Sequence, residues 1–95
     1  MINASVVIPL YNSESSIEIL VDEINTILNS YQVDFILVND CSTDNTHEKC
    51  LKLQKKFKNK LTYIKLKKNS GEHNAVMAGL NYAKGNKVFI VDDDF

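Results

Sequence analysis

The most chemically distinctive feature of the sequence is an acidic triplet, Asp92-Asp93-Asp94. It directly follows Val88-Phe89-Ile90-Val91, an apolar run that predicts a buried strand. Three adjacent carboxylates repel one another unless a cation offsets their charge. Alternate residues of an extended chain point the same way, so we expect Asp92 and Asp94 to face one ion and Asp93 to face elsewhere. Hard oxygen ligands favour Mg²⁺ or Mn²⁺, and a solvated acidic turn is the alternative.

Other polar side chains that could bind a ligand follow two earlier apolar runs. Asp40 comes after Phe35-Ile36-Leu37-Val38, where its carboxylate could hydrogen-bond a base or a ribose, or cap the following helix. Tyr11 could stack on a flat base or cover the first helix. For Asn12 a structural role is favoured, in which its side chain holds the loop by bonding to the backbone. The residues alone leave these alternatives open.

A third candidate segment, Asn69-Ser70-Gly71-Glu72, precedes a predicted helix. Free backbone amides at that helix start could meet an anion, although the Glu72 carboxylate would oppose a phosphate there. His73 is expected to be an exposed or packing residue rather than a metal ligand. His47 is expected to lie on a helix surface.

The elements that position these residues alternate between strand-like and helix-like patterns. Short apolar runs rich in β-branched residues are separated by amphipathic segments of helix length. Ser15 and Glu18 have the spacing of a capping box, and Gly85 is expected to end the third helix in a left-handed conformation. The predicted order is β-α-β-α-β-α-β, an α/β fold with a Rossmann-like parallel sheet. Strands are predicted at 5–8, 35–38, 61–64 and 88–91, and helices from Ser15, from Asp44 to Thr46 onward, and over 72–84.

This order also predicts where a ligand would bind. In parallel sheets ligands bind outside the carboxyl ends of the strands. The four predicted carboxyl ends carry polar, acidic and turn-forming residues, while the opposite ends carry little besides turns. We therefore expect one site at that edge, formed by Pro9-Leu10-Tyr11-Asn12, Asn39-Asp40-Cys41-Ser42, Lys68-Asn69-Ser70-Gly71 and Asp92-Asp93-Asp94.

Composition gives weaker constraints. The formal net charge of −1 offers no global attraction to nucleic acid, and every basic residue is a lysine. Most lysines lie between Lys49 and Lys68, which indicates a solvated helix face or, alternatively, docking on an anionic membrane. Cys41 and Cys50 lack metal-site spacing and predict reduced thiols in a cytosolic protein. The start lacks signal-peptide features, and no run approaches the roughly 20 apolar residues that span a bilayer.

Four segments together resemble the family 2 glycosyltransferases, which have the GT-A fold. The match covers nearly the whole chain in the family's order, so residues 1–95 resemble the N-terminal, nucleotide-sugar-binding half of that fold. The third segment resembles the polyprenyl-phosphate sugar transferases most closely. The four segments are the opening Ser5 to Glu14, the stretch Val38 to Thr46 (similar to V-D-D-G-S-x-D-x-T), Asn69 to Gly79 (N-x-G and its helix), and Val91 to Phe95 (similar to D-x-D).

The resemblance implies roles for individual residues. The loop from Pro9 to Glu14 would line the nucleotide, and Asp40 would hydrogen-bond the base, most often uracil. Asp92 would reach the ribose or the metal, and Asp94 would coordinate the Mg²⁺ or Mn²⁺ that binds the donor pyrophosphate. The nucleotide-binding residues expected on this basis are Pro9, Tyr11, Asn12, Glu14, Asp40, Gly71 and Asp92, and the metal ligands are Asp92 and Asp94.

The same resemblance implies a transferase that moves sugar from a UDP-sugar to a lipid phosphate or a saccharide, in building cell-envelope polysaccharide. It would act in the cytoplasm, at the membrane face, with peripheral membrane contact and homodimer formation as further expectations. No catalytic base is expected within this chain, so residues 1–95 alone are expected to transfer no sugar. Asn39 replaces the family's usual first Asp. Cys41 replaces Gly and is expected to change the turn's backbone.

Two other functions fit parts of the pattern. The run from Val88 to Asp94 is similar to the first strand and acidic pocket of a phospho-acceptor receiver domain, but here it closes the sequence instead of opening it. A non-catalytic module that binds a nucleotide without transferring sugar is the other alternative. A phosphorylation assay separates the first from a glycosyltransferase, and sugar transfer by the parent protein separates the second.

Overall fold

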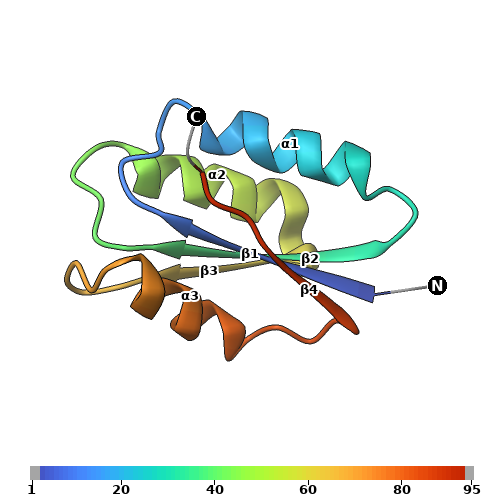
Figure 1. The fold of residues 1–95 in the computed structure, drawn as a ribbon. Helices are drawn as coiled ribbons and strands as arrows, with labels where there is room; N and C mark the ends of the chain where they lie inside the picture. Colours follow the sequence, from blue (N-terminus) through green and yellow to red (C-terminus); the bar gives the residue numbers. More distant parts are fainter. Residues whose placement is uncertain (1–2, 94–95) are drawn as a thin grey trace.

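A computed structural model describes residues 3–93 and contains a four-stranded parallel sheet with helices on both faces (Figure 1). The strand order is β3-β2-β1-β4, so the two longest strands lie in the middle. The predicted α/β class and β-α-β-α-β-α-β order are therefore confirmed. The elements are β1 (Asn3–Leu10), α1 (Ile17–Ile27), β2 (Gln32–Asn39), α2 (Thr46–Phe57), the short 3₁₀ helix η1 (Lys58–Lys60), β3 (Leu61–Lys65), α3 (Glu72–Leu80) and β4 (Lys87–Ile90).

Two separate apolar cores form on the two faces of the sheet, because alternate residues of β1 and β2 point to opposite sides. The face under α1 and α2 carries the larger core, which includes Val6, Ile8, Phe35 and Leu37. The face under α3 carries a smaller core built on Val7, Ile36, Val38 and Ala75. The amphipathic character expected of the first helix is confirmed, since α1 buries Ile17, Leu20, Val21 and Ile24 on one side.

Helix α3 lies very close to the sheet. A Cβ atom built on Gly79 would lie 2.6 Å from Cγ1 of Val7 and 3.0 Å from Cγ2 of Val38. Glycine therefore sets the separation of α3 from the strands.

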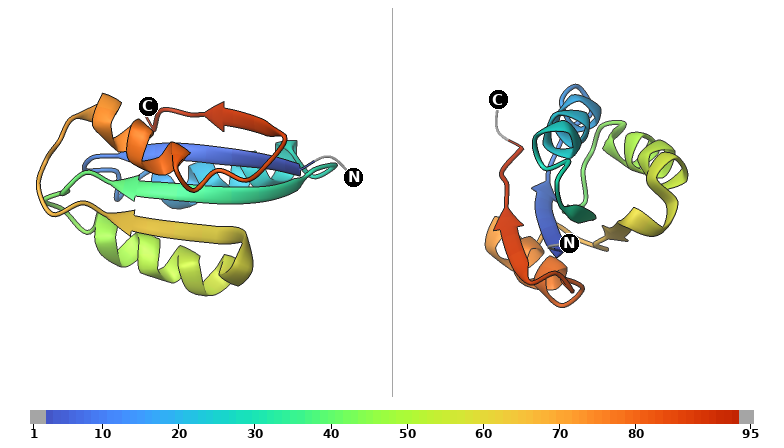
Figure 2. Two further views of the ribbon diagram at one scale, coloured as in Figure 1. Left: turned by 90° about the horizontal axis from the view of Figure 1, so that it is seen from below. Right: turned by 90° about the vertical axis from the view of Figure 1, so that its right-hand side faces the viewer.

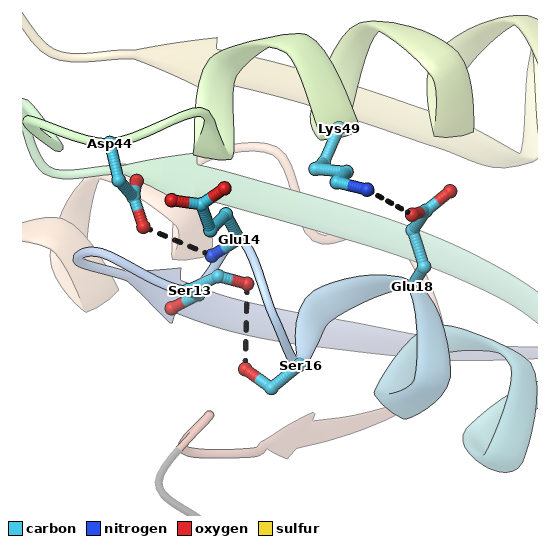
Figure 3. A network of polar contacts seen from close by, with 6 residues as sticks. All are labelled: Ser13, Glu14, Ser16, Glu18, Asp44 and Lys49. Atoms are coloured by element: carbon cyan, nitrogen blue, oxygen red, sulfur yellow. Dashed lines mark hydrogen bonds and ion pairs between the residues drawn. The ribbon is translucent and has the colours of Figure 1, made fainter.

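Two predicted helix ends are wrong. Helix α1 begins at Ile17 with Ser16 as its N-cap and has no side-chain cap, so Ser15 and Glu18 form no capping box. Glu18 is held instead by an ion pair with Lys49 of α2, at 3.0 Å (Figure 3). Helix α3 ends at Leu80 rather than residue 84, and its C-cap, Asn81, is right-handed.

Gly85 has a different role from the predicted left-handed cap, since its φ is not positive. A Cβ at this position would lie 2.7 Å from the backbone nitrogen of Ser5 and 2.8 Å from the carbonyl carbon of Ala4. Glycine is required here because the chain passes directly against the backbone of β1.

Strand β4 is exposed, contrary to the prediction of a buried strand. It pairs only with β1 among the described residues and lies at the edge of the sheet (Figure 1). Val88, Phe89 and Ile90 are 45%, 37% and 51% exposed. The apolar pattern was read correctly as a strand, but sequence periodicity does not distinguish an edge position from a central one.

Candidate nucleotide-binding site

The carboxyl ends of the strands meet at one edge of the sheet, as the sequence predicted, and we call this the carboxyl edge. Backbone hydrogen bonds continue the strand pairing into the loops that leave it. The amide of Asp40 donates to the carbonyl of Leu10 at 2.8 Å, and that of Val91 donates to the carbonyl of Val7 at 3.0 Å. The loops after β1 and β2 and the segment after β4 are therefore fixed relative to one another.

Asp40 is the most buried acidic residue that the structure describes at this edge. Its side chain is buried, with 4% exposure, and both of its carboxylate oxygens accept backbone hydrogen bonds. Ser70 donates to Oδ1 at 2.7 Å and Gly71 donates to Oδ2 at 2.9 Å. Asp40 therefore does not cap the following helix α2, which was one of its predicted roles. It anchors the loop that begins α3 to the end of β2.

A small pocket of about 60 Å³ lies beside Asp40, between the end of β1 and the start of α3. Tyr11 lines this pocket and is 50% exposed, so part of the side chain is open to a ligand. The pocket brings together two of the predicted base-binding residues, Tyr11 and Asp40. It is lined by Pro9, Leu10, Tyr11, Asp40, Glu72 and Ala75.

Gly71 supplies the backbone conformation that lets this loop reach Asp40. Its φ of 90° lies in the region that favours glycine, and its carbonyl accepts the amide of Ala75 in the first turn of α3. His73 is exposed, as expected. The amides of Ser70 and Gly71, predicted as anion donors, are already used by the Asp40 carboxylate.

Asn12 joins the loop after β1 to the loop after β2. The side-chain oxygen of Asn12 accepts hydrogen bonds from the backbone amide and the hydroxyl of Thr43, at 2.8 and 3.2 Å. The backbone amide of Asn12 donates to the hydroxyl of Ser42 at 3.0 Å. Cys41 has a φ of 58°, in the left-handed region that favours glycine, the residue that the family usually has there. Whether the backbone differs from that of the family stays a prediction.

Asp44 also joins the loop after β1 to the loop after β2 (Figure 3). Its carboxylate accepts the amide of Glu14 at 3.2 Å and the amide of Thr46 at 3.0 Å. Desolvation raises the pKa of Asp44, but hydrogen bonds from Thr46 and Glu14 outweigh it and hold the pKa below its ordinary value. Glu14 thus enters the site through its backbone, as part of a loop that Asp44 fixes.

A polar network behind the site was missed by sequence reasoning. Asn39 donates from Nδ2 to the Tyr63 hydroxyl at 3.0 Å, and that hydroxyl lies 2.8 Å from Nδ1 of His47. The other end of Asn39, Oδ1, accepts the amide of Ser42 at 3.0 Å. Burial raises the pKa of Tyr63 to about 12. His47 therefore takes part in a polar network and is more than a residue on the helix surface. An ionised Asp at position 39 could not donate a hydrogen bond to Tyr63, as the Asn39 amide does.

The structure describes the first two residues of the acidic triplet, and the prediction that Asp92 and Asp94 face one ion stays a prediction. Asp92 is exposed beyond the end of β4. Asp93 turns toward the start of α1, where its Oδ2 accepts the hydroxyl hydrogen of Ser16 at 2.7 Å. The other oxygen of Asp93, Oδ1, is buried without a hydrogen-bond partner among the described residues. Asp94 lies outside the described residues.

The described residues could hold a metal ion only if oxygen atoms of a bound ligand completed its coordination. Within residues 3–93, no cluster of three His, Cys, Asp or Glu side chains could hold a metal ion. Asp92 is one open carboxylate at the carboxyl edge. One or two carboxylates completed by phosphate oxygens is the ordinary coordination of Mg²⁺ at nucleotide sites. The donor chemistry therefore fits a metal shared with a pyrophosphate.

Comparison with protein families gives a match over residues 5–95 to the family described as glycosyl transferase family 2. The chain belongs to glycosyl transferase family 2. The receiver-domain alternative is therefore wrong. The structure agrees, because the strand proposed to open a receiver, β4, is an exposed edge strand.

The relatives and solved structures that the chain matches are longer than the chain itself. An undecaprenyl-phosphate 4-deoxy-4-formamido-L-arabinose transferase from Photorhabdus laumondii is 34% identical over 92 residues, which cover 95% of this chain and 28% of the relative. Residues 1–349 of TarS from S. aureus, in complex with UDP, are 32% identical with a TM-score of 0.76, and the match covers 97% of this chain and 27% of the TarS chain in that structure. Its complex with UDP-GlcNAc gives 33% identity and a TM-score of 0.75, covering 97% and 26%.

A mannosyltransferase from Pyrobaculum calidifontis, in complex with GDP-Man and Mn²⁺, matches with a TM-score of 0.76. It is 21% identical and covers 98% of this chain and 28% of its own, so it is similar in fold alone. The chain thus spans under a third of the proteins that it matches. The described residues contain no helix that is both long and apolar enough to span a membrane.

Proposed function

We propose that this chain is the donor-binding part of a glycosyltransferase that uses a nucleotide-sugar, with UDP as the favoured nucleotide. The observation that carries the proposal is the pocket in which Asp40 and the exposed Tyr11 ring adjoin at the carboxyl edge. Family membership supports the reaction class, and the similar TarS structure with bound UDP supports the nucleotide.

Base recognition would use acceptor capacity that Asp40 retains. A carboxylate offers about four lone-pair sites, and the amides of Ser70 and Gly71 occupy one on each oxygen. The imide N–H of uracil could donate to one of the remaining sites while the ring stacks against Tyr11. The backbone hydrogen bonds fix the carboxylate in place, so little side-chain entropy would be lost when the base binds.

Asp92 and Asp94 would hold Mg²⁺ or Mn²⁺ together with the donor pyrophosphate. Such an ion would supply Lewis-acid stabilisation of the negative charge on the departing nucleoside diphosphate. Asp93 would contribute indirectly, because its bond to Ser16 ties the segment after β4 to the start of α1. Asn12 and Asp44 would keep the loop from Pro9 to Glu14 in the conformation that receives the nucleotide.

The acceptor is proposed to be a polyprenyl phosphate, by likeness to the undecaprenyl-phosphate transferase. A phosphate acceptor is already an anion, so it would need no base for activation. We place the parent protein in the cytoplasm at the membrane face, where the exposed lysines of α2, Lys52, Lys55 and Lys56, would favour anionic lipid.

Calorimetric titration with UDP tests the proposal. We expect binding in the presence of Mn²⁺ that EDTA reverses, because carboxylates and pyrophosphate repel each other without a cation. Asp92→Asn should weaken it by roughly tenfold or more, the effect of about 1.4 kcal/mol or more. Asp34→Asn, a matched change on the same sheet but away from the carboxyl edge, should leave it unchanged. Equal affinity with and without Mn²⁺ would contradict the metal-dependent site.

A further inference from the structure

A second and larger pocket, of about 330 Å³, lies near the opposite, amino ends of the strands. It forms because α3 has only nine residues and covers only part of its face of the sheet. Figure 2 (left) shows β1 and β2 extending beyond α3 toward their amino ends, with the chain after α3 crossing beside them. The volume falls within the range of ordinary small-molecule sites, roughly 300–1,000 Å³.

One wall of this pocket is firmly built. The hydroxyl oxygen of Ser5, which is fully buried, accepts the amides of Lys84 and Gly85 at 3.0 and 2.8 Å. Gly85 packs against the backbone of β1 so closely that no side chain fits there. The segment that carries Tyr82 and Lys84 is therefore fixed to β1, and the pocket is formed before any ligand arrives.

The pocket carries charges of both signs. Asp34 of β2 is partly buried in its lining, and Lys60 and Lys84 contribute two ammonium groups. Burial raises the pKa of Asp34 and the charge of Lys84 lowers it, and no hydrogen bond contributes to the shift. Among the described residues, neither lysine forms a salt bridge with Asp34 within 4.0 Å. The carboxylate is thus available to a donor from a ligand.

The remaining lining groups are neutral and can each donate and accept hydrogen bonds. Asn3, Gln32 and Asn59 supply amides, and Thr62 supplies a hydroxyl. Tyr82 is 50% exposed and presents an aromatic ring at the same pocket. The lining therefore combines one acceptor-only group, two donor-only groups, several groups of both kinds, and a flat apolar surface.

This combination selects among ligand classes. Asp34 offsets part of the attraction that Lys60 and Lys84 exert on an inorganic anion, and the two lysines oppose a simple cation beside Asp34. An apolar ligand would leave the desolvated polar groups without partners. A neutral polyhydroxyl compound has hydroxyls that donate to Asp34 and accept from the lysines, and its C–H face can pack on Tyr82.

We propose that this pocket binds a saccharide unit, at a site separate from the nucleotide site at the carboxyl edge. The proposal does not depend on the identity of the donor nucleotide. A free sugar should bind weakly, with a Kd on the order of 1 mM, because so small a ligand has few atoms with which to offset the cost of association. If the bound saccharide were one unit of a longer glycan, binding here would raise the local concentration of the rest of that glycan.

The test is a titration of the ¹⁵N-labelled chain with N-acetylglucosamine, glucose and their β-linked disaccharides, followed by amide chemical shifts. We expect saturable shifts at Asp34, Thr62 and Lys84, with none at Asp40. Asp34→Asn and Tyr82→Ala should each weaken binding by roughly tenfold, as expected for loss of a charged hydrogen-bond partner or an aromatic contact. Asp22→Asn, the same chemical change at an exposed position on α1, is the matched control and should bind like the parent.

Three results would overturn the proposal. The first is the absence of shifts at these amides for every saccharide. The second is saturable shifts at the same amides with inorganic phosphate, which would make the pocket an anion site. The third is full retention of saccharide binding by Asp34→Asn and Tyr82→Ala. A separate titration of the same labelled chain with UDP and Mg²⁺, followed at the amide of Asp40, distinguishes failure here from failure of the proposed nucleotide site.

Discussion

Replacement of Asp40 by Asn tests how the structure couples stability to the candidate site. In the unsubstituted chain, the two carboxylate oxygens of Asp40 accept hydrogen bonds from the backbone amides of Ser70 and Gly71, and Asp40 is 4% exposed. Asn has the same shape but only one acceptor oxygen, so its NH₂ group must face one of these two backbone donors. One charge-assisted hydrogen bond is lost, and the other loses its charge.

The magnitude follows from the burial and number of these bonds. A hydrogen bond to a charged group contributes about 1.5–3 kcal/mol, and a buried donor left without a partner costs about 1–3 kcal/mol. We therefore expect Asp40→Asn to lower the free energy of unfolding by about 2–3 kcal/mol. For a domain of this size each 1 kcal/mol lowers the melting midpoint by about 4–8 °C.

The assay is urea unfolding followed by circular dichroism at neutral pH, with Asp40→Ala and Asp34→Asn alongside. Asp40→Ala leaves both backbone donors unsatisfied and should cost more than Asp40→Asn. Asp34→Asn, at a partly buried carboxylate without such bonds, should not be destabilised. UDP affinity is then measured at a temperature where Asp40→Asn stays folded, and should fall by about 1–3 kcal/mol. Parent-like stability of Asp40→Asn would refute the anchoring role inferred from the geometry.

Three further predictions follow from other parts of the fold. Burial raises the pKa of Asp34 in the folded state, so ionisation of this carboxyl destabilises the fold. Asp34→Asn should therefore be more stable than the unsubstituted chain at neutral pH. Urea unfolding should show this advantage disappear as the pH falls through the folded-state pKa of Asp34. Burial raises the pKa of Tyr63 to about 12, so the protonated hydroxyl contributes its full stability below pH 10, and this stability is lost as the pH rises toward 12. Tyr63→Phe should cost roughly 1–3 kcal/mol of unfolding free energy and should remove that alkaline loss. If Tyr63→Phe left the dependence of stability on alkaline pH unchanged, the burial of the hydroxyl would be contradicted. Gly85→Ala would place Cβ 2.7 Å from the Ser5 nitrogen and should lower the unfolding free energy by about 1–3 kcal/mol in the same assay, whereas a neutral effect would show that the segment is not fixed to β1.

The sequence predicted the sheet well because its signals were regular. Apolar runs at 5–8 and 35–38 are buried on both faces, which is the pattern of central parallel strands. The position of the site followed from that topology, because parallel strands bring their carboxyl ends together. Asp40 and Tyr11 were accordingly placed at one edge before any contact was known.

The parts that the sequence did not predict depend on contacts between distant residues. The anchoring of residues 70 and 71 by Asp40 joins positions 30 and 31 residues apart, and nothing local indicates it. The link between Asn39, Tyr63 and His47 likewise crosses three elements. The capping box failed because one more turn, from Ser13 to Ser16, precedes the helix. Gly85 was assigned by its place after a helix, although the backbone of β1 determines it.

The central claim is that a nucleotide binds at the carboxyl edge, and the location of bound UDP tests it most directly. The measurement is the change in amide chemical shifts of the ¹⁵N-labelled chain on titration with UDP in the presence of Mg²⁺. The account predicts saturable shifts at Tyr11, Asp40, Gly71 and Asp92, removed by EDTA, with the amides of Asp34 and Lys84 unchanged. Shifts confined to Asp34 and Lys84, or no saturable shift at any of these amides, would contradict it.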